Sequence, residues 1–142
     1  MPNNSKRIKF FHQEKPYSCA AACLRMVAAT VGIKRTEEEI RQLCHTDFRG
    51  TYIDDLVSAA RQLGLHAEKR NASIAELTAA EYAIVYLDML PISGIPSIHA
   101  VVLEEVSDTV TVIDPNVGKR LLSLEQFQQA WCLCRNLSVL IR

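Results

Sequence analysis

The hydrophobic pattern of this chain changes part-way along its length, and this change restricts the folds open to it more than any other feature. Residues from about 1 to 80 contain helix-forming segments with capping signals, whereas 81–142 contain short runs rich in Val, Ile and Tyr between turn residues. Helices that precede strands without regular alternation favour an α+β domain over a parallel wound sheet. The length of 142 residues is close to the roughly 150 residues of one average domain. We therefore expect a single domain over 1–142, with a helical part followed by a sheet part.

The clearest predicted helix begins at Cys19 and consists almost entirely of strong helix formers. Ser18 is placed to cap its N-terminus, and Gly32 is placed to end it in a left-handed turn. A second helix is predicted from Thr36, because its side chain can cap while Glu39 reaches back in a capping box. Further helices are predicted at 53–63, after Ser73 and after Ser123.

The predicted strands are short apolar segments that follow residue 81. They are YAIVYLD, IHAVVLEEV, TVTVID and the closing LSVLI. Ser107 and Asp108 stand between the second and third of these segments. We therefore expect the two segments to form a hairpin with a two-residue turn.

Charge and cysteine content exclude several classes of function. The chain has 16 Lys+Arg and 16 Asp+Glu, so no overall positive field gathers nucleic acid or anionic lipid. The number of cysteines is odd and the N-terminus has no apolar signal segment, which favours reduced thiols in a cytoplasmic protein. The longest charge-free apolar segment, 89–103, contains Pro91, Gly94 and Pro96 and is shorter than the about 20 residues of a membrane-spanning helix. We expect no membrane segment in this chain and no nucleic-acid partner.

Cys19 is the first candidate for chemistry because of its place at the start of a helix. A thiol there meets the positive end of the helix dipole and unpaired N–H groups, which favour the thiolate. A lowered pKa of this kind makes a cysteine a nucleophile. The same position also suits a small buried core residue, since free cysteines are often buried.

A cysteine nucleophile needs a base, and His99 with Asp114 is the best-placed pair in the sequence. His99 begins one strand of the predicted hairpin and Asp114 ends the other. With a two-residue turn, Asp114 pairs with Val101, two residues from His99 on the same face. Such diagonal neighbours lie about 7–8 Å apart at Cα, within reach of an imidazole and a carboxylate. The hairpin is therefore expected to orient His99 as a base through Asp114.

Gln13 is a candidate for stabilising an oxyanion. Its side-chain amide, a few residues before Cys19, could donate to the tetrahedral oxyanion beside the Cys19 backbone N–H. Taken alone, a Gln at this position is also typical of a solvated surface.

These residues lie in motifs that resemble one known family. The segment QEKPYSCAAACLRMV resembles the nucleophile motif of the papain-like bacteriocin-processing peptidases, in which Gln also stands six positions before Cys. These enzymes cleave leader peptides after a double glycine and often form the N-terminal domain of peptide-exporting transporters. The stretch HAVVLEEVSDTVTVIDPNVG resembles the family's His strand, hairpin and Asp-Pro turn. With FRGTYIDDL and a closing pattern that includes Trp131, the resemblance covers about 8–142.

The resemblance implies a papain-like cysteine peptidase fold and a role for each candidate. Cys19 would be the nucleophile, His99 the general base and acid, Asp114 the orienting group and Gln13 the oxyanion donor. The substrate would be a small peptide with a Gly-Gly leader, and no cofactor or metal would be required. The implied partner is a peptide-exporting transporter, which would place the protein in the cytoplasm at the inner face of the membrane.

The sequence departs from the family in two respects. The family commonly has Asp and Gly around the nucleophile, whereas Ser18 and Ala20 flank Cys19. The sequence as given also lacks the transporter's membrane and ATP-binding parts, so we expect either a free-standing peptidase or a domain excised from a longer protein. A non-catalytic peptide-binding module of the same fold and an acyl transferase using the same triad are the alternatives.

The other cysteines do not form a convincing metal motif. Cys132 and Cys134 are close in sequence and Cys44 precedes a histidine, but structural zinc sites usually carry two cysteine pairs at C-x₂₋₄-C spacing. Using Cys19 and Cys23 as zinc ligands would consume the proposed nucleophile. We therefore expect no metal site, no clustered-thiol redox site, and Cys23 packed in the core.

Overall fold

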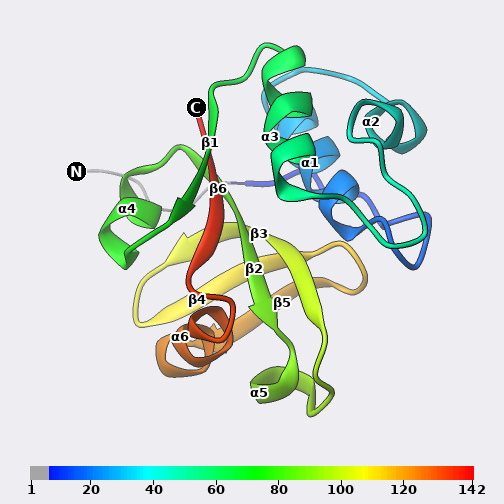
Figure 1. Ribbon diagram of the computed structural model, residues 1–142. Helices are drawn as coiled ribbons and strands as arrows, with labels where there is room; N and C mark the ends of the chain where they lie inside the picture. The colour runs from blue at the N-terminus through cyan, green and yellow to red at the C-terminus, as the bar shows by residue number, and fades with distance from the viewer. Residues whose placement is uncertain (1–6) are drawn as a thin grey trace.

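The computed structural model describes residues 7–142 and shows helices packed around a central sheet (Figure 1). The sheet has six strands in the order β1-β6-β2-β3-β4-β5, and all neighbouring strands are antiparallel. The strands are β1 (Ala67–Asn71), β2 (Tyr82–Asp88), β3 (Ile98–Val106), β4 (Thr109–Asp114), β5 (Gly118–Ser123) and β6 (Leu137–Ile141). The helices are α1 (Cys19–Thr30), α2 (Glu37–Leu43), α3 (Ile53–Gln62), α4 (Ile74–Ala79), α5 (Leu90–Ser93) and α6 (Leu124–Cys132). None of these helices is long and apolar enough to cross a membrane.

The two faces of the sheet bury separate apolar cores. One core joins α1, α2 and α3 to strand residues that include Ile84 and Val102. The other core joins α6 to the alternate residues of the same strands, such as Val85 and Val101. Because successive side chains of a strand point to opposite faces, α1–α3 cover one face and α6 covers the other (Figure 1). The predicted α+β class, with helices packed on an antiparallel sheet, is confirmed.

The predicted boundary between a helical part and a sheet part at about residue 80 needs correction. Residues 1–6 lie outside the described residues, and β1 lies inside the predicted helical part, where it pairs with β6. Neither β1, β5 nor the short α5 was predicted. Both β1 and β5 stand at the edges of the sheet, and most of their residues are exposed or half-buried. Edge strands of this kind carry polar side chains and lack the apolar alternation that identifies a strand in sequence.

Most of the predicted helix caps are confirmed, with one exception at α1. Thr36 and Ser73 both form complete capping boxes, and the Ser123 side chain accepts from the N–H of Gln126. The Ser18 side chain does not cap α1 within the described chain. Its Oγ instead accepts from the N–H of Lys15 at 3.0 Å and donates to the Lys15 carbonyl, so Ser18 closes the loop before the helix.

The hairpin of β3 and β4 has the predicted register near His99, although its turn is longer than predicted. Val106 pairs with Val110, so the predicted two-residue turn is wrong. A β-bulge between Leu103 and Glu105 then shifts the register by one residue, and Val102 pairs with Ile113. The extra residue in the turn and the extra residue in the bulge compensate, because each moves the pairing by one position in opposite directions. The strand ends that carry His99 and Asp114 consequently meet as expected.

Candidate active site

The first helix places Cys19 against the sheet. Cys19 is the first residue of α1 and is half-buried, and the residues that follow it, Ala20–Ala22, are small and buried. One turn further on, the thiol of Cys23 donates to the carbonyl of Ala100 at 3.3 Å. Ala100 directly follows His99 on β3. This bond therefore ties the first turns of α1 to the strand that carries His99.

His99 stands between Cys19 and Asp114. Its Nε2 lies 2.6 Å from Oδ1 of Asp114, and the side chains of His99 and Asp114 are 15% and 1% exposed. Since Nε2 is engaged by the carboxylate, Nδ1 is the ring nitrogen left to interact with the neighbouring Cys19 thiol. The structure places the Cys19 thiol beside His99, and His99 in turn bonds to the buried carboxylate of Asp114.

The surroundings favour the ionised forms of these three groups. Burial alone raises the pKa of the Cys19 thiol, but hydrogen bonds with His99 and the Ala100 backbone, and the charge of His99, hold it below its ordinary value. Burial lowers the pKa of His99, yet the hydrogen bonds to Asp114 and Cys19 outweigh this effect and raise it to about 9. Burial would also raise the pKa of Asp114, but hydrogen bonds from His99 and Arg120 lower it to about 2. A thiolate beside an imidazolium is the favoured state.

Gln13 lies in the loop before α1 and is held next to the Asp114 turn. Its backbone N–H donates to the carbonyl of Pro115 at 2.7 Å, and the residue is 8% exposed. Its side-chain Nε2 donates to the carbonyl of Lys15 at 2.7 Å. Among the described residues, Oε1 of Gln13 has no hydrogen-bond partner. One hydrogen of the amide is therefore engaged within the loop, and no bond of the second hydrogen is found among the described residues.

Glu37, the first residue of α2, holds the loop before α1 in place and was not identified from the sequence. Its side chain is 0% exposed, and its Oε1 accepts from the N–H of Glu14 at 2.9 Å. Its Oε2 accepts from Nε of Arg41 at 3.0 Å, and Arg41 also contacts the Glu14 carboxylate. The i,i+4 pairing of Glu37 with Arg41 was visible in the sequence, but burial of the carboxylate depends on the loop that folds over α2.

Replacing Glu37 with Ala is expected to lower the free energy of unfolding by about 3 kcal/mol, because Arg41 loses its buried partner and the Glu14 N–H loses its acceptor. Chemical denaturation followed by circular dichroism measures this change. Glu38→Ala is the matched control, since Glu38 is exposed on the same turn of α2 and a change within about 0.5 kcal/mol is expected. Equal effects of the two substitutions would contradict the role of Glu37.

The remaining cysteines differ from Cys19 in their surroundings. All five cysteines are free thiols. Burial raises the pKa of Cys23, and it raises the pKa of Cys44 to about 12 and that of Cys134 to about 11. Cys23 is packed in the core as predicted. Among residues 7–142, no group of three or more His, Cys, Asp or Glu side chains is placed to hold a metal ion.

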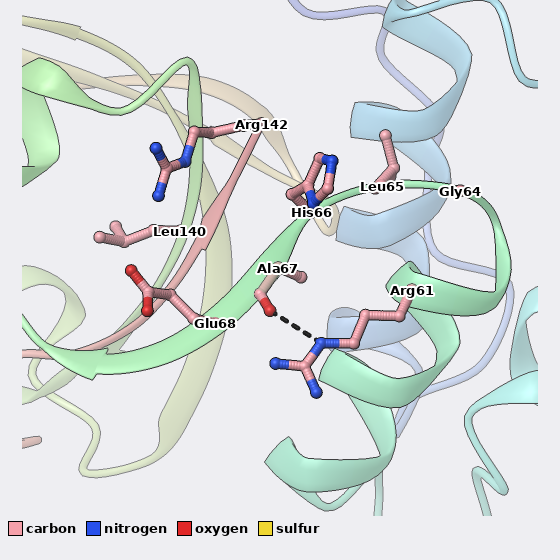
Figure 2. A pocket seen from close by; sticks show the side chains of 8 residues that line it. All are labelled: Arg61, Gly64, Leu65, His66, Ala67, Glu68, Leu140 and Arg142. Atoms are coloured by element: carbon pink, nitrogen blue, oxygen red, sulfur yellow. Dashed lines mark hydrogen bonds between the residues drawn. The ribbon is translucent and has the colours of Figure 1, made fainter.

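A separate cavity lies beside α3, away from Cys19. It has a volume of about 440 Å³ and is lined by residues of α3, β1, β6 and the segments that adjoin them, including Arg61, His66 and Arg142. Figure 2 shows Nε of Arg61 donating to the carbonyl of Ala67, while the guanidinium of Arg142 points away from that of Arg61. Because the basic groups do not converge on one point, this cavity lacks the arrangement of a built anion site.

Comparison with known proteins assigns the family. The profile of the Peptidase C39 family matches residues 7–136, which include Gln13, Cys19, His99 and Asp114. The chain belongs to the Peptidase C39 family. This C39 chain is accordingly a cysteine peptidase, and the hydrolase class and family inferred from its motifs are confirmed.

Solved structures confirm the fold of this C39 peptidase. A double-glycine motif protease from an AMS/PCAT transporter, solved with its leader peptide, has a TM-score of 0.82 at 21% identity and covers 96% of this chain and 92% of that chain. The peptidase domain of Streptococcus ComA, a bifunctional ABC transporter of a quorum-sensing pathway, has a TM-score of 0.81 at 24% identity, with 95% and 98% covered. The papain-like arrangement expected from the motifs is therefore confirmed.

Sequence relatives of this C39 peptidase include longer proteins. The pediocin PA-1 transport/processing ATP-binding protein PedD of Pediococcus acidilactici is 31% identical over 117 residues, which is 80% of this chain. The chain spans only 16% of the length of PedD. An uncharacterized protein of Methanothermobacter thermautotrophicus is 28% identical over 117 residues, with 82% of this chain and 78% of that protein covered.

Proposed function

We propose that this C39 peptidase hydrolyses the peptide bond that follows a Gly-Gly pair in the leader of a small peptide, with Cys19, His99 and Asp114 as its catalytic triad. The observation that carries the proposal is the placement of the Cys19 thiol beside His99, whose other ring nitrogen bonds to the buried carboxylate of Asp114. This arrangement occurs in a chain of the Peptidase C39 family.

The reaction begins with the thiolate of Cys19. Its sulfur attacks the carbonyl carbon of the scissile bond and forms a tetrahedral oxyanion. The Cys19 backbone N–H has no acceptor within its helix because it belongs to the first turn of α1, and it donates to this oxyanion. The Gln13 amide donates its second hydrogen from the neighbouring loop. Both donors are fixed before substrate binds, since Gln13 is anchored to Pro115 and Lys15.

His99 then acts first as an acid and later as a base. The proton on its Nδ1 passes to the leaving amine as the C–N bond breaks, which leaves a thioester on Cys19. Neutral His99 next takes a proton from water, and the resulting hydroxide attacks the thioester carbonyl. The C–S bond breaks, the leader is released with a new carboxylate, and the thiolate–imidazolium pair is restored. Asp114 remains ionised throughout and holds the imidazole by Nε2.

The substrate class rests on the relatives. One structural neighbour is named as a double-glycine motif protease and was solved in complex with the leader peptide. PedD is named for pediocin transport and processing. For this chain we accordingly propose a Gly-Gly leader as substrate and a peptide exporter as partner, acting at the inner face of a membrane. We also propose that 1–142 works as one domain, since both cores share the same sheet.

Cleavage of a synthetic double-glycine leader peptide tests this function. We expect a single cut after the second glycine, and we expect replacement of that glycine with valine to lower kcat/KM by about 10²-fold, because the proposed specificity for glycine excludes a branched side chain. Liquid chromatography with mass spectrometry measures both peptides. Equal cleavage of the glycine and valine peptides, or cleavage at other bonds, would contradict the proposed specificity.

A further inference from the structure

The carboxylate of Asp114 has a second charged partner besides His99. Its Oδ1 faces Nε2 of His99 at 2.6 Å and also accepts from the N–H of Asn116 at 2.8 Å. Its Oδ2 accepts from Nε of Arg120 at 2.8 Å. With a side chain 1% exposed, Asp114 depends on these three donors for all of its hydrogen bonding.

The sheet places Arg120 next to Asp114 on the side away from His99. Arg120 lies on β5 and pairs with Val112, which precedes Asp114 by two residues on β4. Side chains two apart on a strand share a face, so Arg120 and Asp114 are diagonal neighbours across the β4–β5 pair. His99 reaches Asp114 from β3 on the other side of β4. Asp114 is therefore held between two cations from two different strands.

We propose that Arg120 is a positioning residue of the peptidase site, which fixes Oδ2 of Asp114 so that Oδ1 stays aligned with His99 and which offsets part of the carboxylate's charge. This inference rests on the proposed function, because it assigns a role relative to the triad. Arg120 acts through Asp114 and does not contact the reacting sulfur.

The hydrogen bond and the charge of Arg120 have separable effects. Loss of the donor leaves a buried carboxylate oxygen unpaired, and the carboxylate can then rotate away from Nε2. Without the positive charge of Arg120, the negative charge of Asp114 acts on His99 with less compensation. The imidazolium is then more stable, and the pKa of His99 rises. The titratable groups that face His99 are Asp114 from β4 and Cys19 from α1. Those that act on Asp114 are His99 from β3 and Arg120 from β5, and the charge of Asp114 also reaches the thiol of Cys23 on α1.

The neighbouring Lys119 supplies a matched control. It also lies on β5, but its side chain is 60% exposed and pairs with Glu104 at 3.2 Å, on the opposite face from Arg120. Lys119→Gln therefore removes one positive charge at nearly the same place in the chain without touching Asp114.

Three substitutions separate the two effects of Arg120. Arg120→Lys retains the charge and a donor, Arg120→Gln retains a donor without the charge, and Arg120→Met removes both. NMR titration of the His99 ring, assigned with His99→Ala, reads the charge effect without any substrate. We expect the His99 midpoint to rise by about one pH unit in Arg120→Gln and to stay unchanged in Arg120→Lys and Lys119→Gln. We expect Arg120→Met to lower kcat for leader cleavage about tenfold, with recovery in Arg120→Lys.

The outcomes distinguish this inference from the proposed function. If Arg120→Gln leaves the His99 midpoint where Lys119→Gln leaves it, the charge of Arg120 does not act on His99 and the inference is overturned. If Arg120→Met folds and retains full kcat, Arg120 does not position Asp114. If the wild-type protein fails to cleave the leader peptide, the proposed substrate is wrong, whereas the NMR titration of Arg120→Gln still decides the role of Arg120.

Discussion

Replacing Cys19 with Ala is expected to reduce cleavage of a double-glycine leader peptide by about 10⁴-fold or more in kcat. The thiolate of Cys19 forms the covalent intermediate, and no other thiol lies beside His99 among the described residues. Alanine is the best helix former, so α1 and the fold are expected to remain intact. Chromatographic measurement of the cleaved peptide, with the thermal unfolding curve as a check on folding, gives the result.

Cys132→Ala is the matched control for this substitution. Cys132 is an exposed thiol at the end of α6, on the face of the sheet opposite α1. Its removal is expected to leave kcat within about twofold, since surface substitutions away from a site have small effects. Activity retained in Cys19→Ala, or lost equally in both variants, would refute the role of Cys19 as nucleophile.

Replacing His99 with Ala is expected to lower kcat by about 10⁴-fold at neutral pH. The substitution removes the proton donor for the leaving amine and the base for the water, and it also removes the cation that holds Cys19 as a thiolate.

The pH profile of the wild-type protein is expected to have two limbs. As pH increases, activity should first rise because Cys19, whose pKa is lowered, loses its proton, and it should then fall near pH 9 because His99 loses its proton. A pH profile of kcat/KM measures both limbs.

His66→Ala provides a control for the loss of a histidine. His66 precedes β1 and lines the separate cavity beside α3, and it is exposed. We expect an unchanged pH profile in this variant. If His99→Ala retained the wild-type profile, a different group would have to act as the base.

The parts of the fold that sequence predicted well are those governed by local signals. The capping boxes at Thr36 and Ser73 involve residues three apart, so they could be identified without knowledge of tertiary structure. The apolar strands β2, β3 and β4 are buried and rich in branched residues, which makes their pattern distinct. Edge strands β1 and β5 depend on pairing with distant partners, and their polar sequences gave no comparable signal.

In the candidate site, too, the residues set by local sequence could be predicted and those set by distant contacts could not. His99 and Asp114 could be paired from sequence because both belong to one hairpin, and the bulge after Leu103 restored the register that the longer turn had shifted. Arg120 belongs to an unpredicted edge strand, and Glu37 is buried only because the loop with Glu14 folds over it. Sequence therefore indicated the residues that react, whereas the residues that hold them in place required the assembled sheet and loops.

The central claim, that His99 holds Cys19 as a thiolate, is tested most directly by the rate at which iodoacetamide alkylates Cys19 as a function of pH. Mass spectrometry of proteolytic fragments reports each thiol separately. Because the pKa of Cys19 is lowered beside His99, we predict that Cys19 in the wild-type protein reacts at pH 6 far faster than Cys132. We predict that Cys19 reacts several-fold more slowly at pH 6 in His99→Ala, because the thiol then loses the neighbour that lowers its pKa. Alkylation of Cys19 at pH 6 no faster than that of Cys132, or unchanged by loss of His99, would contradict the thiolate–imidazolium pair.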